Sequence, residues 1–151
     1  MSPRYSFAPA SPSDDRYLTS AHRVLAERWT ERDGRAALAD RCCGRCEGCG
    51  TVWHGQAAHR KRVSQGGTWS PVNLLALCGS GITSCHGLAH HHPLWAQGLG
   101  WEVLPEEDPA EHAVWLLHPV HGPGRYLLAV TWDGDGIRRH VVIPVQARWV
   151  A

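Results

Sequence analysis

Residues 46–92 read CEGCGTVWHGQAAHRKRVSQGGTWSPVNLLALCGSGITSCHGLAHHH, and they contain the most informative motifs of the chain. It contains four of the six cysteines and six of the eleven histidines. No Asp or Glu occurs between Glu47 and Glu102. A metal ion bound in this stretch must therefore be held mostly by Cys and His side chains.

Two pairs of cysteines have spacings that suit a metal ion. Cys46 and Cys49 are separated by two residues, the spacing at which one tight turn directs two thiolates at the same ion. Cys78 and Cys85 form a second pair with a wider gap. Four deprotonated Cys ligands would make a tetrahedral structural Zn²⁺ site that leaves no open position for catalysis.

Two further cysteines, Cys42 and Cys43, precede the first pair. Cys43 and Cys46 also have the two-residue spacing, so either of the earlier cysteines could compete for zinc. Otherwise they would be buried or free thiols. In a reducing compartment such a cluster is more typical of metal ligands than of disulfides.

The histidines of the stretch suggest a second metal site. His86 and His90 are four residues apart in a segment that we expect to be helical, so they share one face and could hold one ion. A neutral His can accept the proton of a water molecule near pH 7, and His59 lies in the same acid-free segment. The scattered histidines at 112, 118, 121 and 140 lack ligand spacing and suit packing or surface positions.

A basic run follows His59. It consists of Arg60, Lys61 and Arg62 and opens a loop that contains Gly66 and Gly67. Glycines allow a backbone to approach another molecule closely, and a basic run beside them suits phosphate groups. We therefore expect these three side chains to contact a nucleic-acid backbone rather than bases.

The order of these motifs resembles that of the HNH, or ββα-metal, endonucleases, especially the small actinobacterial and phage-borne versions. Those proteins pair CxxCG with downstream HR, GG, NLLALC and CHG motifs. The resemblance covers about a third of the chain and does not extend before Cys42 or after Trp101. The matching positions are Cys46 to Gly50, His59-Arg60, Gly66-Gly67, Asn73 to Cys78, and Cys85-His86-Gly87.

The resemblance implies a metal-dependent endonuclease that hydrolyses phosphodiester bonds of double-stranded DNA. It implies that His59 is the general base and that Asn73 holds the loop around that base. It also implies that His86 binds the catalytic divalent cation. Among the cysteines it favours structural zinc at Cys46, Cys49, Cys78 and Cys85. Relatives often lie beside phage packaging genes, so analogy alone suggests a terminase partner.

One position departs from the family pattern. The family usually has a metal-binding Asp or His immediately before the general base, and this chain has Ala58. His90 could replace that ligand, and His91 and His92 are weaker candidates. A site made of histidines would suit Mn²⁺, Ni²⁺, Co²⁺ or Zn²⁺ better than Mg²⁺, which prefers oxygen ligands. The alternative is a catalytically inactive, zinc-stabilised module that binds nucleic acid. A third possibility, a redox or zinc-storage protein that uses the cysteines, would leave the histidines without a role.

The predicted fold class is α+β, with a zinc-stabilised ββα-metal core, N-terminal helices and a small C-terminal antiparallel sheet. We expect a flexible arm over residues 1–13, a nuclease domain over 14–101 and a β extension over 102–151. That extension could cover the core, mediate dimerisation or contact a partner. The expected helices are 14–31, 35–41, 84–91 and 93–98; the expected strands are 51–58, 73–77, 113–118, 126–132 and 137–144, with a hairpin turn at 133–136.

Length, charge and hydrophobicity bear on the number of domains, the partners and the cellular location of the protein. The 151 residues suit one domain with peripheral additions, and the net charge of +1 indicates no strong overall field toward nucleic acid. Acidic residues gather on both sides of the Cys- and His-rich stretch, which leaves that stretch locally positive. No apolar run reaches the length of a membrane span, so we expect a cytoplasmic protein without a membrane partner.

Overall fold

The computed structural model describes residues 29–132 and 138–145. The predicted arm over 1–13, the predicted helix up to residue 28 and the hairpin turn at 133–136 lie outside the described residues. Trp29 and Thr30 are not helical, so a continuous helix over 14–31 is wrong at its C-terminal end. The elements are α2 (Glu31–Cys42), β1 (Ala57–His59), η2 (Val63–Gln65), η3 (Pro71–Asn73), β2 (Leu74–Ala76), α3 (Ser84–His91), α4 (Pro93–Gly98), η4 (Pro109–Glu111), β3 (Val114–His118), β4 (Gly122–Trp132) and β5 (Arg138–Pro144).

Helix α2 begins earlier than the predicted helix over 35–41. The side-chain oxygen of Thr30 caps it by accepting a hydrogen bond of 3.1 Å from the backbone N–H of Asp33. Gly34 lies inside the helix, one residue before the predicted start. A Cβ at this position would collide with the carbonyl oxygen of Trp69, so the glycine allows close packing of the two segments.

The central segment forms two short antiparallel strands followed by a helix. In β1 and β2, His59 lies opposite Leu74. The first strand begins later than predicted, because residues 45–52 form a turn in which the Cys46 N–H donates a 2.7 Å hydrogen bond to the Thr51 carbonyl. Helix α3 has the predicted bounds of 84–91. The order strand, strand, helix fits the expected unit, and its identification with the ββα-metal core stays a prediction.

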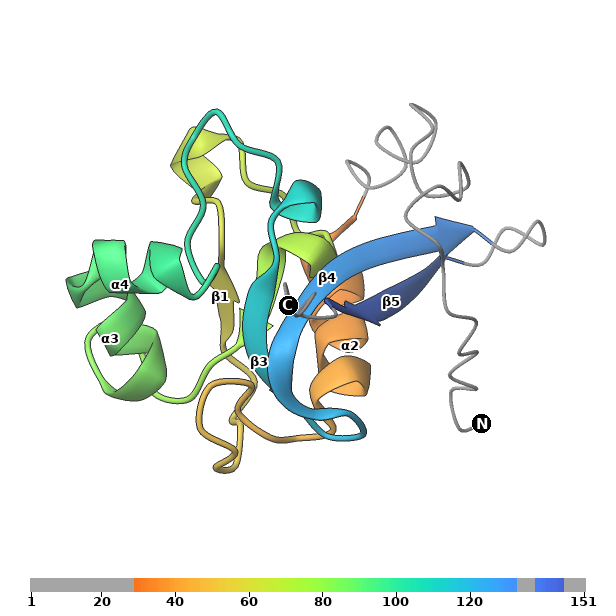
Figure 1. Ribbon diagram of the computed structural model, residues 1–151, viewed down its shortest axis with the longest axis horizontal. Helices are drawn as coiled ribbons and strands as arrows, with labels where there is room; N and C mark the ends of the chain where they lie inside the picture. The colour runs from red at the N-terminus through yellow and green to blue at the C-terminus, as the bar shows by residue number, and fades with distance from the viewer. Residues whose placement is uncertain (1–28, 133–137, 146–151) are drawn as a thin grey trace, which may run out of the picture.

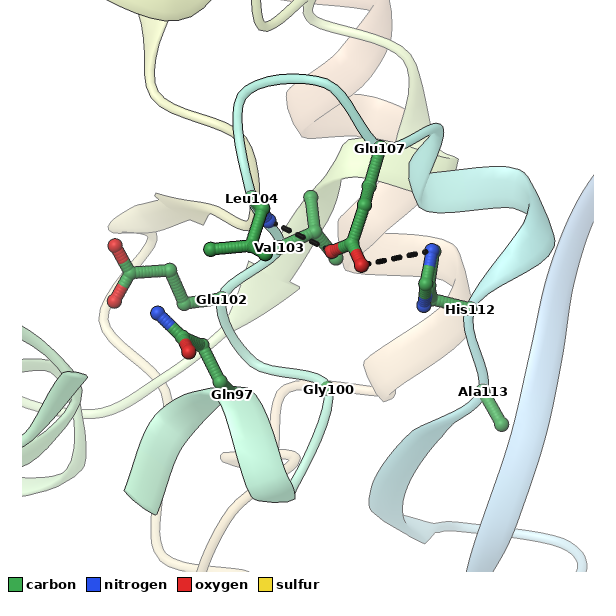
Figure 2. A pocket seen from close by; sticks show the side chains of 8 residues that line it. All are labelled: Gln97, Gly100, Glu102, Val103, Leu104, Glu107, His112 and Ala113. Carbon is green, nitrogen blue, oxygen red and sulfur yellow. Dashed lines mark hydrogen bonds and ion pairs between the residues drawn. The ribbon is translucent and has the colours of Figure 1, made fainter. Parts of the chain in front are cut away.

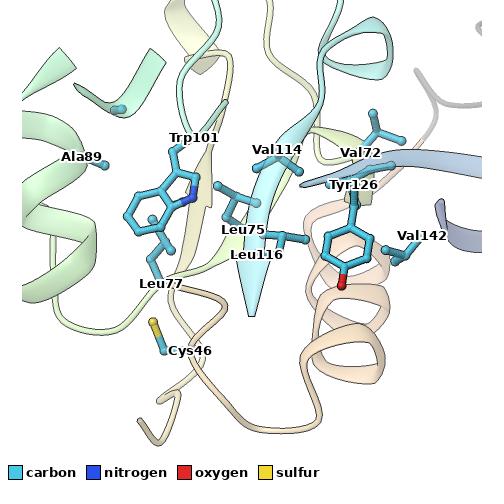
Figure 3. Packing of buried hydrophobic residues seen from close by; sticks show 13 residues of the cluster. Cys46, Val72, Leu75, Leu77, Ala89, Trp101, Val114, Leu116, Tyr126 and Val142 are labelled. Carbon is cyan, nitrogen blue, oxygen red and sulfur yellow. The ribbon is translucent and has the colours of Figure 1, made fainter. Parts of the chain in front are cut away.

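The C-terminal strands form the predicted antiparallel sheet in the order β3-β4-β5. Helices α3 and α4 lie on one side of the strands and α2 on the other (Figure 1). The sheet shares one hydrophobic core with the central segment, in which Trp101 and Leu75 pack near Leu116 and Tyr126 (Figure 3). Covering the core is therefore a role that this sheet performs. The prediction of a mixed α+β protein with small antiparallel sheets is confirmed.

Candidate functional site

The four predicted cysteines gather into one cluster. The Sγ atoms of Cys46, Cys49, Cys78 and Cys85 all lie within 4.8 Å of one another, and those of Cys49 and Cys78 are 3.5 Å apart. Tetrahedral zinc with Zn–S bonds of about 2.3 Å would place sulfurs about 3.8 Å apart. The cluster therefore fits a metal ion such as zinc, with four sulfur ligands and no open coordination position.

The two earlier cysteines are outside this cluster. The Cys42 thiol is buried and contacts the Ala39 carbonyl, whereas Cys43 is exposed and contacts the Asp40 carbonyl. Both thiols thus stay with the last turn of α2. Cys46 therefore lies with Cys49 in the cluster, and the alternative pairing of Cys46 with Cys43 is not formed.

Backbone groups support the sulfur atoms. The N–H groups of Gly48 and Cys78 point at Cys46 Sγ from 3.3 and 3.2 Å, respectively. Burial raises the pKa of Cys46, and these hydrogen bonds offset part of that effect. A Cβ on Gly48 would press against the Trp101 ring and lie 3.2 Å from Cys85 Sγ. The tight turn between the first two ligands therefore requires a residue without a side chain.

The sulfurs share protons when no cation is bound. Burial acts to raise the pKa of Cys49, but hydrogen bonds from Thr51, Cys78 and Cys85 outweigh it and lower that pKa to about 6. Burial and the neighbouring sulfurs raise the pKa of Cys85. Cys49 thus becomes a thiolate more readily than Cys85, and a bound cation would favour deprotonation of its ligands.

A small cavity beside this cluster brings together the three predicted histidines. His59 at the end of β1 and both His86 and His90 on α3 line it. The His86 and His90 rings are 4.9 Å apart between centroids, as expected for positions one helical turn apart. The cavity volume is about 20 Å³, which is room for about one water molecule or ion. The other lining residues are Ala58, Arg62, Ala89, Trp101 and Glu102.

Two imidazole nitrogens in this region lack hydrogen-bond partners. His59 Nε2 and His86 Nδ1 are both buried and unpaired. A buried polar atom without a partner costs free energy, and it is therefore a candidate for contact with a bound ion or water. Burial lowers the pKa of both histidines, assisted by Arg35 at His59 and by His90 at His86. Both rings are thus neutral near pH 7, the state needed to accept a proton or bind a cation.

Asn73 joins the two ends of the loop that follows His59. Its side-chain oxygen accepts a 2.7 Å hydrogen bond from the Lys61 N–H, and its amide donates to the Lys61 and Thr68 carbonyls at 3.0 Å each. The His59 ring packs edge-on against Trp69 in the same loop, with 4.5 Å between ring centroids. Asn73 therefore holds the backbone beside His59 in a defined conformation.

The three basic residues have different environments, and the expectation of a phosphate contact is wrong for Arg60. Arg60 is fully buried, and its guanidinium donates hydrogen bonds of 2.7–3.0 Å to four backbone carbonyls. The sequence could not reveal these acceptors, because the four carbonyls come from segments that are far apart in the chain and meet only in the folded protein. Lys61 Nζ donates to the Glu107 carbonyl, and Arg62 is exposed and pairs with Glu102 at 3.1 Å.

Glu102 is the site residue that the sequence pattern did not indicate. It lines the histidine cavity and also an adjoining pocket of about 140 Å³. In that pocket its carboxylate lies on the opposite side from the Glu107 and His112 pair (Figure 2). Glu102 stands at the end of the acid-free stretch, which was the one sequence signal that could have drawn attention to it.

Within the described ranges, the four cysteines are the one group of three or more Cys, His, Asp or Glu ligand atoms that converge. None of the helices in those ranges combines the length and apolar character that a membrane span requires. No protein-family model matches the chain, and no curated protein or solved structure shows significant similarity to it.

Proposed function

We propose that this protein is a metal-dependent endonuclease of the HNH type that hydrolyses phosphodiester bonds of DNA. The supporting observation is the cavity of about 20 Å³ that His59 shares with His86 and His90, with unpaired buried nitrogens on two of the three rings. A cavity of this size suits one water molecule or one ion rather than an organic substrate. A phosphate group would then meet the site from outside.

His59 is the general base in this proposal. Its lowered pKa keeps the ring neutral near pH 7, and its unpaired Nε2 can accept the proton of the attacking water. A positioned general base contributes roughly 10²- to 10⁴-fold to the rate. Asn73 and Trp69 keep this ring in place through the loop contacts described above.

His86 and His90 hold the divalent cation in this proposal. When bound, the cation supplies positive charge at the phosphate and at the leaving oxygen. Imidazole ligands favour Mn²⁺, Ni²⁺, Co²⁺ or Zn²⁺ over Mg²⁺. The four cysteines bind a separate structural zinc, which fixes the start of α3 because Cys85 directly precedes His86.

A non-catalytic DNA-binding module is the second candidate, and Ala58 favours it. Ala58 is 5% exposed and lines the cavity, so the position that carries an acidic or His ligand in the resembled family has only a methyl group. Binding of DNA would then rest on Arg62 and on the stretch over residues 48–101 that lacks Asp and Glu. Zinc at the cysteines would stabilise the fold in either case.

Plasmid cleavage tests the proposal. Wild type should cut in Mn²⁺, Ni²⁺ or Co²⁺, and His59→Ala should cut at least about 100-fold more slowly while it retains zinc and DNA binding, because a base acts only in the chemical step. His54→Ala is the matched control, since His54 is exposed and outside the cavity. DNA binding without cleavage by wild type in any of these ions would establish the non-catalytic alternative.

A further inference from the structure

The histidine cavity contains one carboxylate, and that carboxylate is engaged by an arginine. Among the eight residues that line the cavity, Glu102 is the one acid. Its Oε1 lies 3.1 Å from Arg62 Nη2, and Arg62 also lines the cavity. The Glu102 side chain is 15% exposed and that of Arg62 is 51% exposed, so the pair lies at the rim of the cavity with the arginine outward.

Hydrogen bonds fix the backbone around Glu102, so that only its side chain is free to change conformation. The Glu102 N–H donates to the Ala96 carbonyl, and the next N–H, of Val103, donates to the Arg60 carbonyl at 3.0 Å. Trp101 is buried and its indole N–H donates to the Trp115 carbonyl. By contrast, a partly exposed ion pair contributes only about 0–1 kcal/mol, so the carboxylate can exchange Arg62 for another cation at little cost.

We propose that Glu102 is the oxygen ligand of the divalent cation and that Arg62 holds this carboxylate until a phosphate group takes the guanidinium. This inference rests on the proposed function and deepens it. It explains how a cavity with Ala58 in place of a ligand obtains an oxygen donor. It also agrees with the arrangement seen: while Arg62 engages Glu102, the two histidines and the carboxylate do not converge as three ligands.

The exchange couples the substrate to the ion. A DNA phosphate that binds Arg62 releases Glu102, and Glu102 then strengthens binding of the cation beside His86 and His90. By linkage the cation must strengthen DNA binding by the same factor. The site would thus be assembled fully only when DNA is present.

Calorimetric titration of Mn²⁺ into zinc-loaded protein tests this inference without relying on cleavage. Glu102→Gln should weaken Mn²⁺ binding about tenfold or more, because the amide loses the anionic ligand. Arg62→Ala should tighten it by up to about fivefold, because the competitor for the carboxylate is removed. In the double variant the Arg62 substitution should have no effect, since both act through the same carboxylate.

Controls separate this inference from the proposed function. Glu106→Gln removes an exposed acid outside the cavity and should bind Mn²⁺ as wild type does. His86→Ala should lose Mn²⁺ binding. If His86→Ala loses binding while Glu102→Gln binds normally, the Glu102 inference is wrong and the proposed cation site stands. If wild type binds none of Mn²⁺, Ni²⁺ and Co²⁺, either alone or with a DNA duplex present, both are wrong.

A short DNA duplex added to the His59→Ala protein tests the role of Arg62. The duplex should tighten Mn²⁺ binding in this background, and that gain should disappear when Arg62→Ala is added. Urea unfolding and zinc content of each variant should match wild type, because the pair is partly exposed. A gain from DNA that persists without Arg62 would overturn the exchange.

Discussion

Arg41 and Glu47 form a buried, bidentate ion pair that connects α2 to the first cysteine turn. Arg41 Nε lies 2.6 Å from Glu47 Oε1, Nη2 lies 2.8 Å from Oε2, and both side chains are 1% exposed. Arg41 also donates to the Pro71 and Leu74 carbonyls, and Glu47 accepts from the Ala76 N–H. The pair therefore links α2 and the first cysteine turn to the backbone of β2.

Removal of one partner should be costly. Glu47→Ala should lower the free energy of unfolding by about 3–5 kcal/mol, because it leaves the Arg41 charge buried without a counter-ion. Urea unfolding of the zinc-loaded protein measures this, with Glu106→Ala as an exposed control. A loss below about 1 kcal/mol would contradict the role of the pair. Arg41→Met combined with Glu47→Leu should cost less than the two single changes added together.

Zinc binding should require the four clustered cysteines and should not require Cys42 or Cys43. Purified wild type should contain about one zinc per chain, and Cys78→Ser should lose it because three sulfurs form a weaker site. Cys43→Ser should keep its zinc, since that thiol lies outside the cluster. A strong chelator should unfold the wild type, because metal binding in such sites supplies about 10 kcal/mol or more of folding free energy. Metal analysis and circular dichroism measure both effects. Less than about half an equivalent in wild type, or loss of zinc from Cys43→Ser, would contradict the assignment.

Arg60 and Arg62 should behave oppositely. Arg60→Ala should lower the free energy of unfolding by about 3 kcal/mol or more, because it leaves buried carbonyls without donors. Arg62→Ala should change stability by less than about 1 kcal/mol and reduce the salt dependence of DNA binding by about one phosphate contact. Urea unfolding and binding across a salt series distinguish them. Normal stability with weaker DNA binding in Arg60→Ala would contradict the burial of this side chain.

A carboxylate at position 58 should improve the proposed enzyme. Ala58→Asp should raise cleavage and shift the preference toward Mg²⁺, because it adds a hard oxygen ligand to the cavity. Ala58→Asn, of similar size without the charge, is the control in the same plasmid assay. The role of His90 is tested beside it: if His90→Ala cuts as well as wild type while His86→Ala is inactive, His90 does not replace the missing ligand.

Acid should weaken the packing between β3 and β4. His118 is 4% exposed, and its Nδ1 accepts 3.2 Å hydrogen bonds from the Val120 and His121 N–H groups. Burial, with a smaller contribution from His121, lowers its pKa to about 4 from the ordinary 6.5. The unfolded chain therefore takes up a proton at a higher pH than the folded chain. Stability should be highest above about pH 6.5 and should fall as the pH decreases toward about 4, by on the order of 2 kcal/mol.

His118→Asn isolates this effect, because Asn keeps an acceptor near the two N–H groups and does not titrate. The variant should lose less stability than wild type between pH 7 and pH 5 in urea unfolding. Any loss of bound zinc at low pH should affect both proteins equally, so the difference between them reports on the histidine. Equal losses would exclude His118 as the source.

The sequence alone determined the features that depend on local spacing. Two residues between Cys46 and Cys49 confine their thiolates to one turn, and four residues from His86 to His90 place both rings on one face of α3. The bounds of α3 and the presence of three C-terminal strands also follow from short-range pattern, since periodicity is a property of neighbouring residues, whereas β4 begins at Gly122 and not at the predicted residue 126.

Only the tertiary structure decided which charged side chains serve the fold and which serve the site. Arg60 and Arg62 look alike in the sequence, yet Arg60 is buried and Arg62 is exposed beside the cavity. The guanidinium of Arg60 donates hydrogen bonds to the carbonyls of Val72, Gly100, Pro109 and His112. Glu102 lies more than forty residues from His59 and reaches the same cavity. Such partners are far apart along the chain, so no local pattern encodes them; they are set by the packing of α4 and the C-terminal sheet against the cysteine turns.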